Sequence, residues 1–128
     1  MTTFQQITLA SLIIICLAGC SGSDTYRGSW KAMNMDGTKF DLLFDEKSFT
    51  VTDSTGKVEK FEYTQNSVNI ENSVKTYGIR LGDGRSYEIN FPIATNENVG
   101  LMKDGSRNPI FTICRDEYKE YDEIFKLN

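Results

Sequence analysis

The chain has 128 residues, carries 14 Lys and Arg against 18 Asp and Glu, and contains no histidine. A net charge of −4 without a basic cluster argues against nucleic-acid binding, because phosphate neutralisation dominates the affinity of nucleic-acid-binding proteins. The absence of histidine removes the commonest general base and the commonest transition-metal ligand. The composition therefore favours one small domain that is neither a nucleic-acid-binding protein nor a histidine-dependent enzyme.

The chain opens with an uncharged segment of nineteen residues that holds an apolar run from Ile7 to Ala18. This run is too short to cross the ~30 Å hydrocarbon core of a bilayer as a stable helix, but its length is typical of a signal-peptide core. The run closes on Leu17-Ala18-Gly19-Cys20, which resembles the lipobox of bacterial lipoproteins. The resemblance implies cleavage between Gly19 and Cys20 and a diacylglycerol on the Cys20 thiol. A second acyl chain on the new amine would make the membrane anchor stable.

The residue after the cysteine, Ser21, resembles the sorting residue of lipoproteins sent to the outer membrane. That resemblance implies a lipid-anchored protein of the cell envelope, in the outer membrane if the host is Gram-negative. We expect three segments: a signal peptide at 1–19, a lipidated cysteine with a short polar tether at 20–25, and a β-barrel domain at 26–128. Removing 19 of the 128 residues leaves 109, enough for one domain of modest core.

Cysteine usage gives a further expectation. Cys16 is lost with the leader and Cys20 carries lipid, so Cys114 has no partner for an intrachain disulfide. A lone cysteine is more often buried than reactive, and we expect Cys114 to lie in the core.

From Tyr26 onward, apolar and polar residues alternate and turn signals recur, which is typical of short half-buried strands. Gly82-Asp83-Gly84 is a strong hairpin signal. The pattern predicts an all-β domain of eight or nine strands in an antiparallel meander. Such a meander should close into a small barrel or fold over on itself, because an open sheet would leave one apolar face exposed to water. The strand faces are expected at Phe40-Leu42-Phe44, Phe49-Val51, Phe61-Tyr63, Val68-Ile70, Tyr77-Ile79-Leu81, Tyr87-Ile89-Phe91, Val99 to Lys103 and Ile110 to Cys114.

The last part of the chain, Arg115 to Leu127, changes character. Apolar side chains recur there at spacings of three and four among many charges, which predicts an amphipathic helix packed on the barrel. A final strand from Tyr121 to Leu127 is the alternative.

Gly28 and Trp30 open the first strand and resemble the Gly-x-Trp signature of lipocalins, in which the tryptophan plugs one end of a barrel. In that family an arginine after the last strand stacks on the tryptophan, and Arg115 stands at the matching place. The resemblance implies a barrel-closing pair of Trp30 and Arg115, joined by a cation–π contact. The Thr-Asp-Tyr type segment of lipocalins is missing, so another small barrel or a sandwich stays open as an alternative.

No catalytic or metal site is predicted. Asp36-Gly37 resembles part of an EF-hand loop, but Leu43 stands where the last ligand is needed. The acidic residues of the C-terminal segment indicate a solvated face. Neither a Gly-x-Ser-x-Gly elbow nor a phosphate-binding glycine loop is present, so we expect no enzyme activity and no cofactor.

Aromatic residues suggest the function, since fourteen of the fifteen follow the leader and must fill the barrel or line a pocket. We expect a membrane-anchored, lipocalin-like binding module for a small hydrophobic ligand or lipid. The alternative is a protein-interaction lipoprotein, an inhibitor or immunity factor against an envelope-active enzyme. The expected partners are the membrane, through the lipid on Cys20, and a small hydrophobic molecule or an envelope protein.

Overall fold

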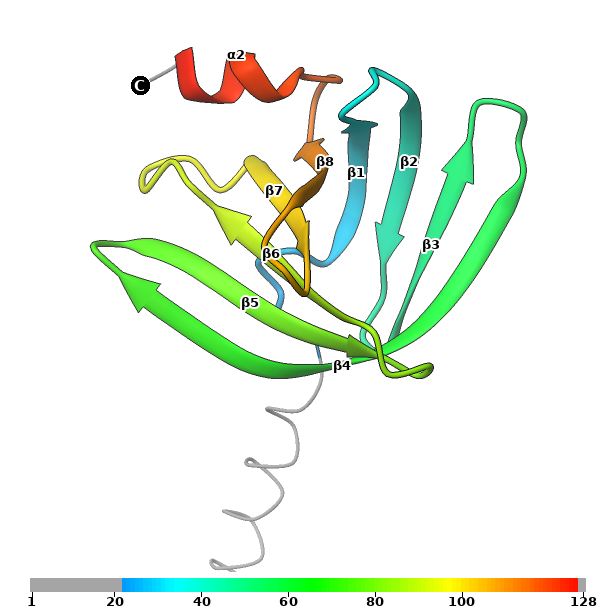
Figure 1. The fold of residues 1–128 in the computed structure, drawn as a ribbon, viewed down its shortest axis with the longest axis horizontal. Coiled ribbons are helices and arrows are strands. Elements are labelled where there is room, and N and C mark those ends of the chain that lie inside the picture. The colour runs from blue at the N-terminus through cyan, green and yellow to red at the C-terminus, as the bar shows by residue number, and fades with distance from the viewer. Residues whose placement is uncertain (1–21, 127–128) are drawn as a thin grey trace, which may run out of the picture.

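Eight antiparallel strands and one short helix make up the fold in the computed structural model, which describes residues 22–126 (Figure 1). The strands are β1 (Gly28–Asn34), β2 (Lys39–Phe44), β3 (Ser48–Asp53), β4 (Val58–Glu71), β5 (Val74–Leu81), β6 (Ser86–Phe91), β7 (Val99–Asp104) and β8 (Pro109–Cys114), and the helix is α2 (Tyr121–Lys126). The predicted all-β meander with a short C-terminal helix is confirmed.

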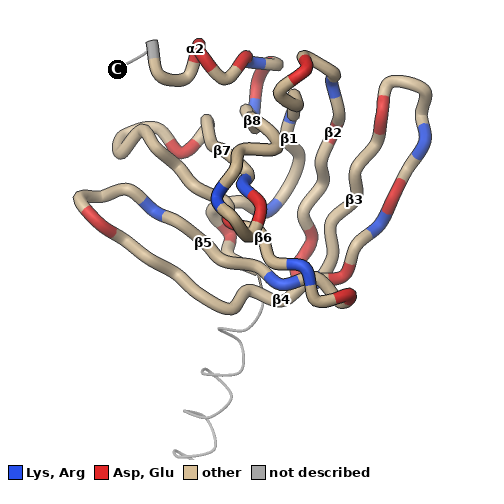
Figure 2. The backbone as a smooth tube through the Cα atoms, viewed as in Figure 1, with Lys and Arg blue, Asp and Glu red and all other residues tan. Residues whose placement is uncertain are grey.

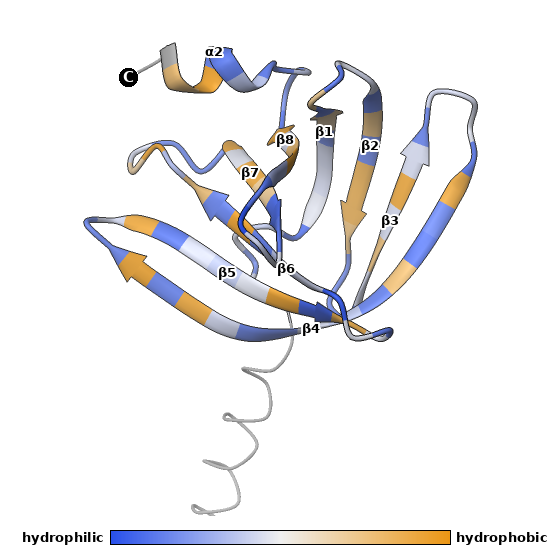
Figure 3. Cartoon of the chain, in the orientation of Figure 1, coloured by the Kyte–Doolittle hydropathy of each residue, from blue (hydrophilic) through white to orange (hydrophobic). Residues whose placement is uncertain are grey.

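Each strand pairs with the next along the chain, and β1 also pairs with β8, so the sheet closes into a barrel. In the closing pair, Lys31 lies opposite Cys114 and Ala32 lies opposite Ile113. Apolar and polar residues alternate along the strands, as the bands in Figure 3 show for β3, β4 and β5. This alternation directs one set of side chains into the barrel and the other toward solvent.

Strand β4 is a single strand of 14 residues, where the sequence pattern left open two separate strands. Its first part pairs with β3 as far as Glu62, and its second part, from Tyr63, pairs with β5. A bulge between Gln65 and Ser67 inserts one residue into the ladder. Because of the bulge, residues on the face that carries the core are odd-numbered before it, as at Tyr63, and even-numbered after it, as at Val68, which lies opposite the core residue Tyr77. Val68 and Ile70 are nevertheless 50% and 59% exposed, so the predicted Val68-Ile70 face lies outside the core.

Aromatic side chains dominate the barrel interior. The fully buried residues Trp30, Tyr26 and Phe44 are the largest of this core, and Phe44 stacks on Phe49 with ring centroids 4.9 Å apart. A second apolar cluster lies on the outer face of the barrel, where Ile124 of α2 packs on β7 and β8. Cys114 belongs to this second cluster and is buried, as predicted. The described residues thus form two cores from their own side chains, so this part should fold alone.

The helix is shorter than predicted. It begins at Tyr121, whereas the sequence pattern predicted a helix from Arg115, and residues 115–120 follow an irregular path. The hydroxyl of Thr112 donates a hydrogen bond to the backbone oxygen of Lys119, which draws this segment onto β8. At the start of the helix, the Glu123 carboxylate accepts a hydrogen bond from the Glu120 amide at 3.0 Å. The alternative of a final strand over 121–127 is wrong within the described residues.

Candidate functional site

The two ends of the barrel are built differently. Because the strands alternate in direction, the tight turns around residues 35–38, 54–57, 82–85 and 105–108 lie at one end, which we call the open end. The start of β1 and the end of β8 lie at the other end, together with the segment that precedes β1. We call this other end the sealed end.

At the sealed end the structure brings Trp30 and Arg115 together. The indole of Trp30 is 1% exposed, and its Nε1 donates a hydrogen bond to the backbone oxygen of Tyr26 at 2.8 Å. The guanidinium carbon of Arg115 lies 3.7 Å from the centroid of the indole. This contact is a close cation–π pair that covers the tryptophan.

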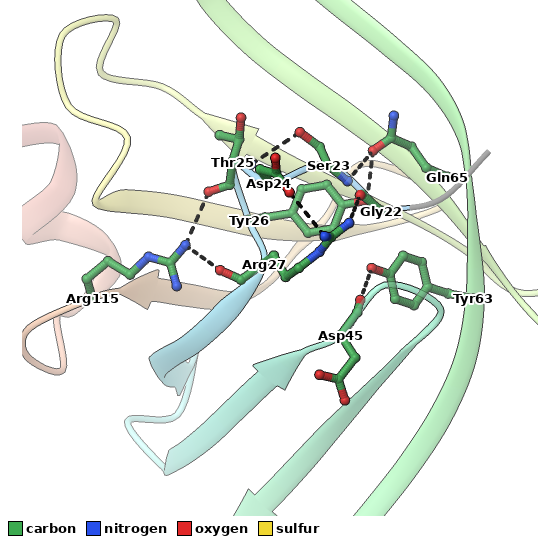
Figure 4. A network of polar contacts seen from close by, with 10 residues as sticks. All are labelled: Gly22, Ser23, Asp24, Thr25, Tyr26, Arg27, Asp45, Tyr63, Gln65 and Arg115. Atoms are coloured by element: carbon green, nitrogen blue, oxygen red, sulfur yellow. Dashed lines mark hydrogen bonds and ion pairs between the residues drawn. The ribbon is translucent and has the colours of Figure 1, made fainter. Parts of the chain in front are cut away.

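The guanidinium of Arg115 also holds the chain that leads into β1. Its Nη1 donates to the backbone oxygen of Ser29 at 2.9 Å, and its Nη2 donates to those of Arg27 at 2.8 Å and Thr25 at 3.2 Å (Figure 4). Burial lowers the pKa of this guanidinium, but its ordinary value is high enough for the charge to persist. One arginine thus ties the end of β8 to the N-terminal segment.

The described part of the segment before β1, residues 22–25, is attached to the barrel. The sequence predicted a short flexible tether over residues 21–25. The amide of Gly22 donates to the Glu46 backbone oxygen at 2.9 Å, and the amide of Ser23 donates to Oε1 of Gln65 at 3.1 Å. The hydroxyl of Tyr77 donates to the Thr25 hydroxyl at 3.0 Å. A segment with these bonds is part of the sealed end.

Tyr26 and Tyr63 complete this seal. Tyr26 is 0% exposed and its hydroxyl donates to Oε1 of Gln65 at 2.8 Å. The Tyr63 hydroxyl donates to the backbone oxygen of Asp45 at 2.6 Å, and Figure 4 shows it beside this loop. Burial raises the pKa of both phenols, and that of Tyr63 the more. In the described residues, these two buried tyrosines close the sealed end.

The open end holds an apolar hollow of about 350 Å³. The hollow falls at the lower end of the range for small-molecule sites, roughly 300–1,000 Å³. Most of its wall is a ring of half-buried apolar side chains, which we call the mouth ring: Phe40, Val51, Phe61, Tyr87, Ile110 and Phe111. The exposed acidic residue Glu59 also lines the hollow.

The floor of the hollow is formed by Phe49, Leu81 and Met102, each at most 4% exposed. Below them the aromatic core fills the barrel as far as Trp30. The interior is therefore packed at the sealed end, and the hollow lies behind the mouth ring.

Arg85 stands at the rim of the hollow. Its guanidinium lies 5.4 Å from the Phe61 ring centroid and donates to the Tyr87 hydroxyl at 3.1 Å. An ion pair with Asp83 at 2.8 Å holds it in the β5–β6 turn. The rim thus pairs a polar, charged group with an apolar wall, an arrangement that can orient an amphipathic ligand.

The other predicted site residues, Gly19 and Cys20 at the expected cleavage and lipidation positions, lie outside the described residues. No site was predicted at Asp36 or in the acidic C-terminal segment. Asp36 and the acidic residues of α2 lie at the surface, and residues 22–126 contain no cluster of three or more possible metal ligands. Within the same range no helix is long and apolar enough to cross a membrane.

The fold and the mouth ring define a small antiparallel β-barrel with one sealed and one open end. No family model matches the chain, and comparison with curated proteins and with solved structures finds no significant similarity. The lipocalin and lipobox resemblances therefore depend on the residues named for them.

Proposed function

We propose that this protein is a lipid-anchored envelope lipoprotein whose barrel binds a small hydrophobic ligand at its open end. The observation that carries the proposal is the mouth ring, whose apolar side chains are only partly buried around a hollow of about 350 Å³. A small barrel ordinarily fills such positions with neighbouring side chains. Apolar wall and charged rim together fit a ligand with an apolar body and a polar end.

The anchor part of the proposal is supported by Leu17-Ala18-Gly19-Cys20 at the end of an uncharged apolar run. It is tested by replacing Cys20 with serine and fractionating cells. The wild-type chain should sediment with membranes, and its mass should exceed that of the polypeptide by the attached lipid. An unlipidated mass for the wild-type protein would contradict the anchor.

The binding part is tested on a soluble form that begins at Gly22 and keeps the whole sealed end. Native mass spectrometry should reveal a co-purifying compound of a few hundred daltons that is lost on denaturation. The fluorescence of 8-anilinonaphthalene-1-sulfonate, an amphipathic apolar probe, should rise on addition of the protein and saturate. The sole tryptophan, Trp30, lies at the sealed end and would report poorly on the mouth ring.

A matched pair of variants on β4 localises the site. Phe61 lines the hollow, whereas Val58, three residues earlier, points outward and is 58% exposed. Phe61→Asp should weaken probe binding about tenfold or more because it places a charge in an apolar wall. Val58→Asp should leave binding unchanged. Equal binding by both variants would reject the mouth ring as the site and favour the protein-interaction alternative.

A further inference from the structure

A groove of about 520 Å³ lies on the outer side of β4, between the β2–β3 loop and the β5–β6 turn. Two backbone hydrogen bonds attach the β2–β3 loop and the β5–β6 turn to β4. The Tyr63 amide donates to the backbone oxygen of Lys47 at 2.9 Å, and the Gly82 amide donates to that of Glu62 at 3.0 Å. The groove is therefore a fixed feature of the barrel wall, separate from the hollow behind the mouth ring.

Three basic side chains line this groove: Lys47, Lys60 and Arg80. All three are exposed, and in residues 22–126 none lies within 4.0 Å of a carboxylate oxygen. Glu62 is the single acidic residue among those that line the groove. The neighbouring loop residues Asp45 and Glu46 do not line it.

The groove thus has a local net charge of +2 on a chain whose net charge is −4. Figure 2 shows Lys and Arg segments at the lower edge, where β4 runs beside the end of β5, with Asp and Glu segments next to them. Some basic residues elsewhere are paired, such as Lys75 with Glu97 at 2.8 Å and Arg85 with Asp83 at 2.8 Å. Others in the described part, such as Lys39 and Lys103, make no ion pair, but they do not line one groove together. A concentration of unpaired positive charge fits an anionic partner.

The place where the described chain begins indicates what that partner is. The Gly22 amide is bonded to the backbone oxygen of Glu46, directly before Lys47. Gly22 follows Cys20 by two residues, and two residues span at most ~7 Å. If Cys20 carries the anchor, as the proposed function holds, its lipid enters the bilayer beside the groove.

We propose that Lys47, Lys60 and Arg80 dock on the phosphate groups of anionic phospholipids in the membrane that holds the anchor. This inference rests on the proposed anchor, but not on ligand binding at the open end. Basic residues close to an anionic bilayer each add to membrane affinity, and the short link from Cys20 keeps these three within reach. The contact would give the barrel a fixed orientation on the membrane.

The test uses the soluble form that begins at Gly22, so that no lipid anchor contributes. Its sedimentation is measured with vesicles of phosphatidylcholine alone and with vesicles that contain phosphatidylglycerol. The wild-type form should bind only the anionic vesicles, and less at higher ionic strength. Changing Lys47, Lys60 and Arg80 together to Gln should lower the partition coefficient at least about tenfold.

The matched control changes Lys57, Lys103 and Arg107 to Gln, with the same loss of charge in or beside the turns of the open end. It should partition like the wild-type form, and circular dichroism should show both triple variants folded. An equal loss in the control, or binding independent of phosphatidylglycerol, would overturn the proposal. So would tight binding of soluble glycerol phosphate at the groove, since that identifies a site for a free anion. If the protein has no lipid anchor, the wild-type chain will have an unlipidated mass. That result is distinct from a failure of the soluble form to bind anionic vesicles.

Discussion

A side chain at Gly28 would press against the guanidinium of Arg115. A Cβ built on Gly28 would lie 3.1 Å from Nη1 of Arg115, and the backbone of Gly28 has a φ of +102°. The guanidinium reaches the indole of Trp30 across this position. The contact between Arg115 and Trp30 therefore needs the space that a residue without a side chain leaves at position 28.

We expect Gly28→Ala to destabilise the protein more than a matched change at Gly37. Gly37 also has positive φ, +85°, but a Cβ added there would meet no atom within 4 Å. Gly37→Ala should cost about 1–2 kcal/mol from backbone strain alone. Gly28→Ala should cost about 1 kcal/mol more, because Arg115 must give up a hydrogen bond. Urea unfolding measures the free energy of unfolding of both variants. Equal losses of stability would mean that Arg115 moves aside without losing a hydrogen bond.

Trp30→Ala should lower the free energy of unfolding by roughly 3–5 kcal/mol, since it empties a site that is 1% exposed. Leu43→Ala is the control, because Leu43 is 42% exposed on the outer face of β2 and should change stability by less than about 1 kcal/mol. Chemical denaturation checks both variants. A near-neutral Trp30→Ala would show that the indole does not support the core.

Removing residues 22–25 from the soluble form should lower its melting temperature. Gln65, Tyr77 and Arg115 would each lose a hydrogen-bond partner in this segment. Each lost bond costs about 1 kcal/mol, and 1 kcal/mol shifts the melting temperature of a domain this size by roughly 4–8 °C. Calorimetry of forms that begin at Gly22 and at Tyr26 makes the comparison. Equal melting temperatures would restore the interpretation of this segment as a free tether.

Stability should fall in alkali because of Tyr63 and Tyr26. Burial raises the pKa of each phenol above its ordinary value of 10.0, so the folded state disfavours the ionised form. The stabilisation is fully present below pH 10 and is lost as the pH rises above it. Urea unfolding between pH 8 and 11.5 should show this fall, and Tyr63→Phe should make it shallower. If the free energy of unfolding falls equally steeply with pH in Tyr63→Phe, the Tyr63 phenol is excluded as the source of the alkaline loss of stability.

The strands could be predicted because alternation is a local property of the sequence. The single strand β4 could not, because its bulge shifts the register by one residue between Tyr63 and Val68. Such a shift in the apolar alternation is also what two separate strands would give. The change of the apolar positions from odd at Phe61 and Tyr63 to even at Val68 and Ile70 was the signal that could have revealed the bulge.

The irregular path before the helix was not predictable either. The spacing of apolar residues after Arg115 suits a helix, but tertiary contacts override it. The Tyr118 hydroxyl donates to the Asp41 carboxylate at 2.8 Å, and Thr112 holds the Lys119 carbonyl. A contact such as that of Tyr118 with Asp41, between residues far apart in the chain, leaves no local trace in the sequence.

The candidate site was predicted only in part. Gly-x-Trp and Arg115 indicated the pair at the sealed end through a family resemblance. The mouth ring was missed, because alternation identifies inward residues without showing at which end of a barrel they lie. Phe61 and Tyr63 look equivalent in the sequence, yet Phe61 lines the hollow and Tyr63 is 3% exposed in the seal.

Strand β4 also has an unpaired edge that a strand of another molecule could pair with. Among the described residues, positions 64–71 pair with β5 on one side and with no strand on the other. Such a free edge is a template for strand addition and aggregation. Here the bulge at Gln65–Ser67 disturbs its regular spacing, and Glu71 places a charge at its tip. These features discourage two barrels from joining edge to edge when they are crowded on the same surface.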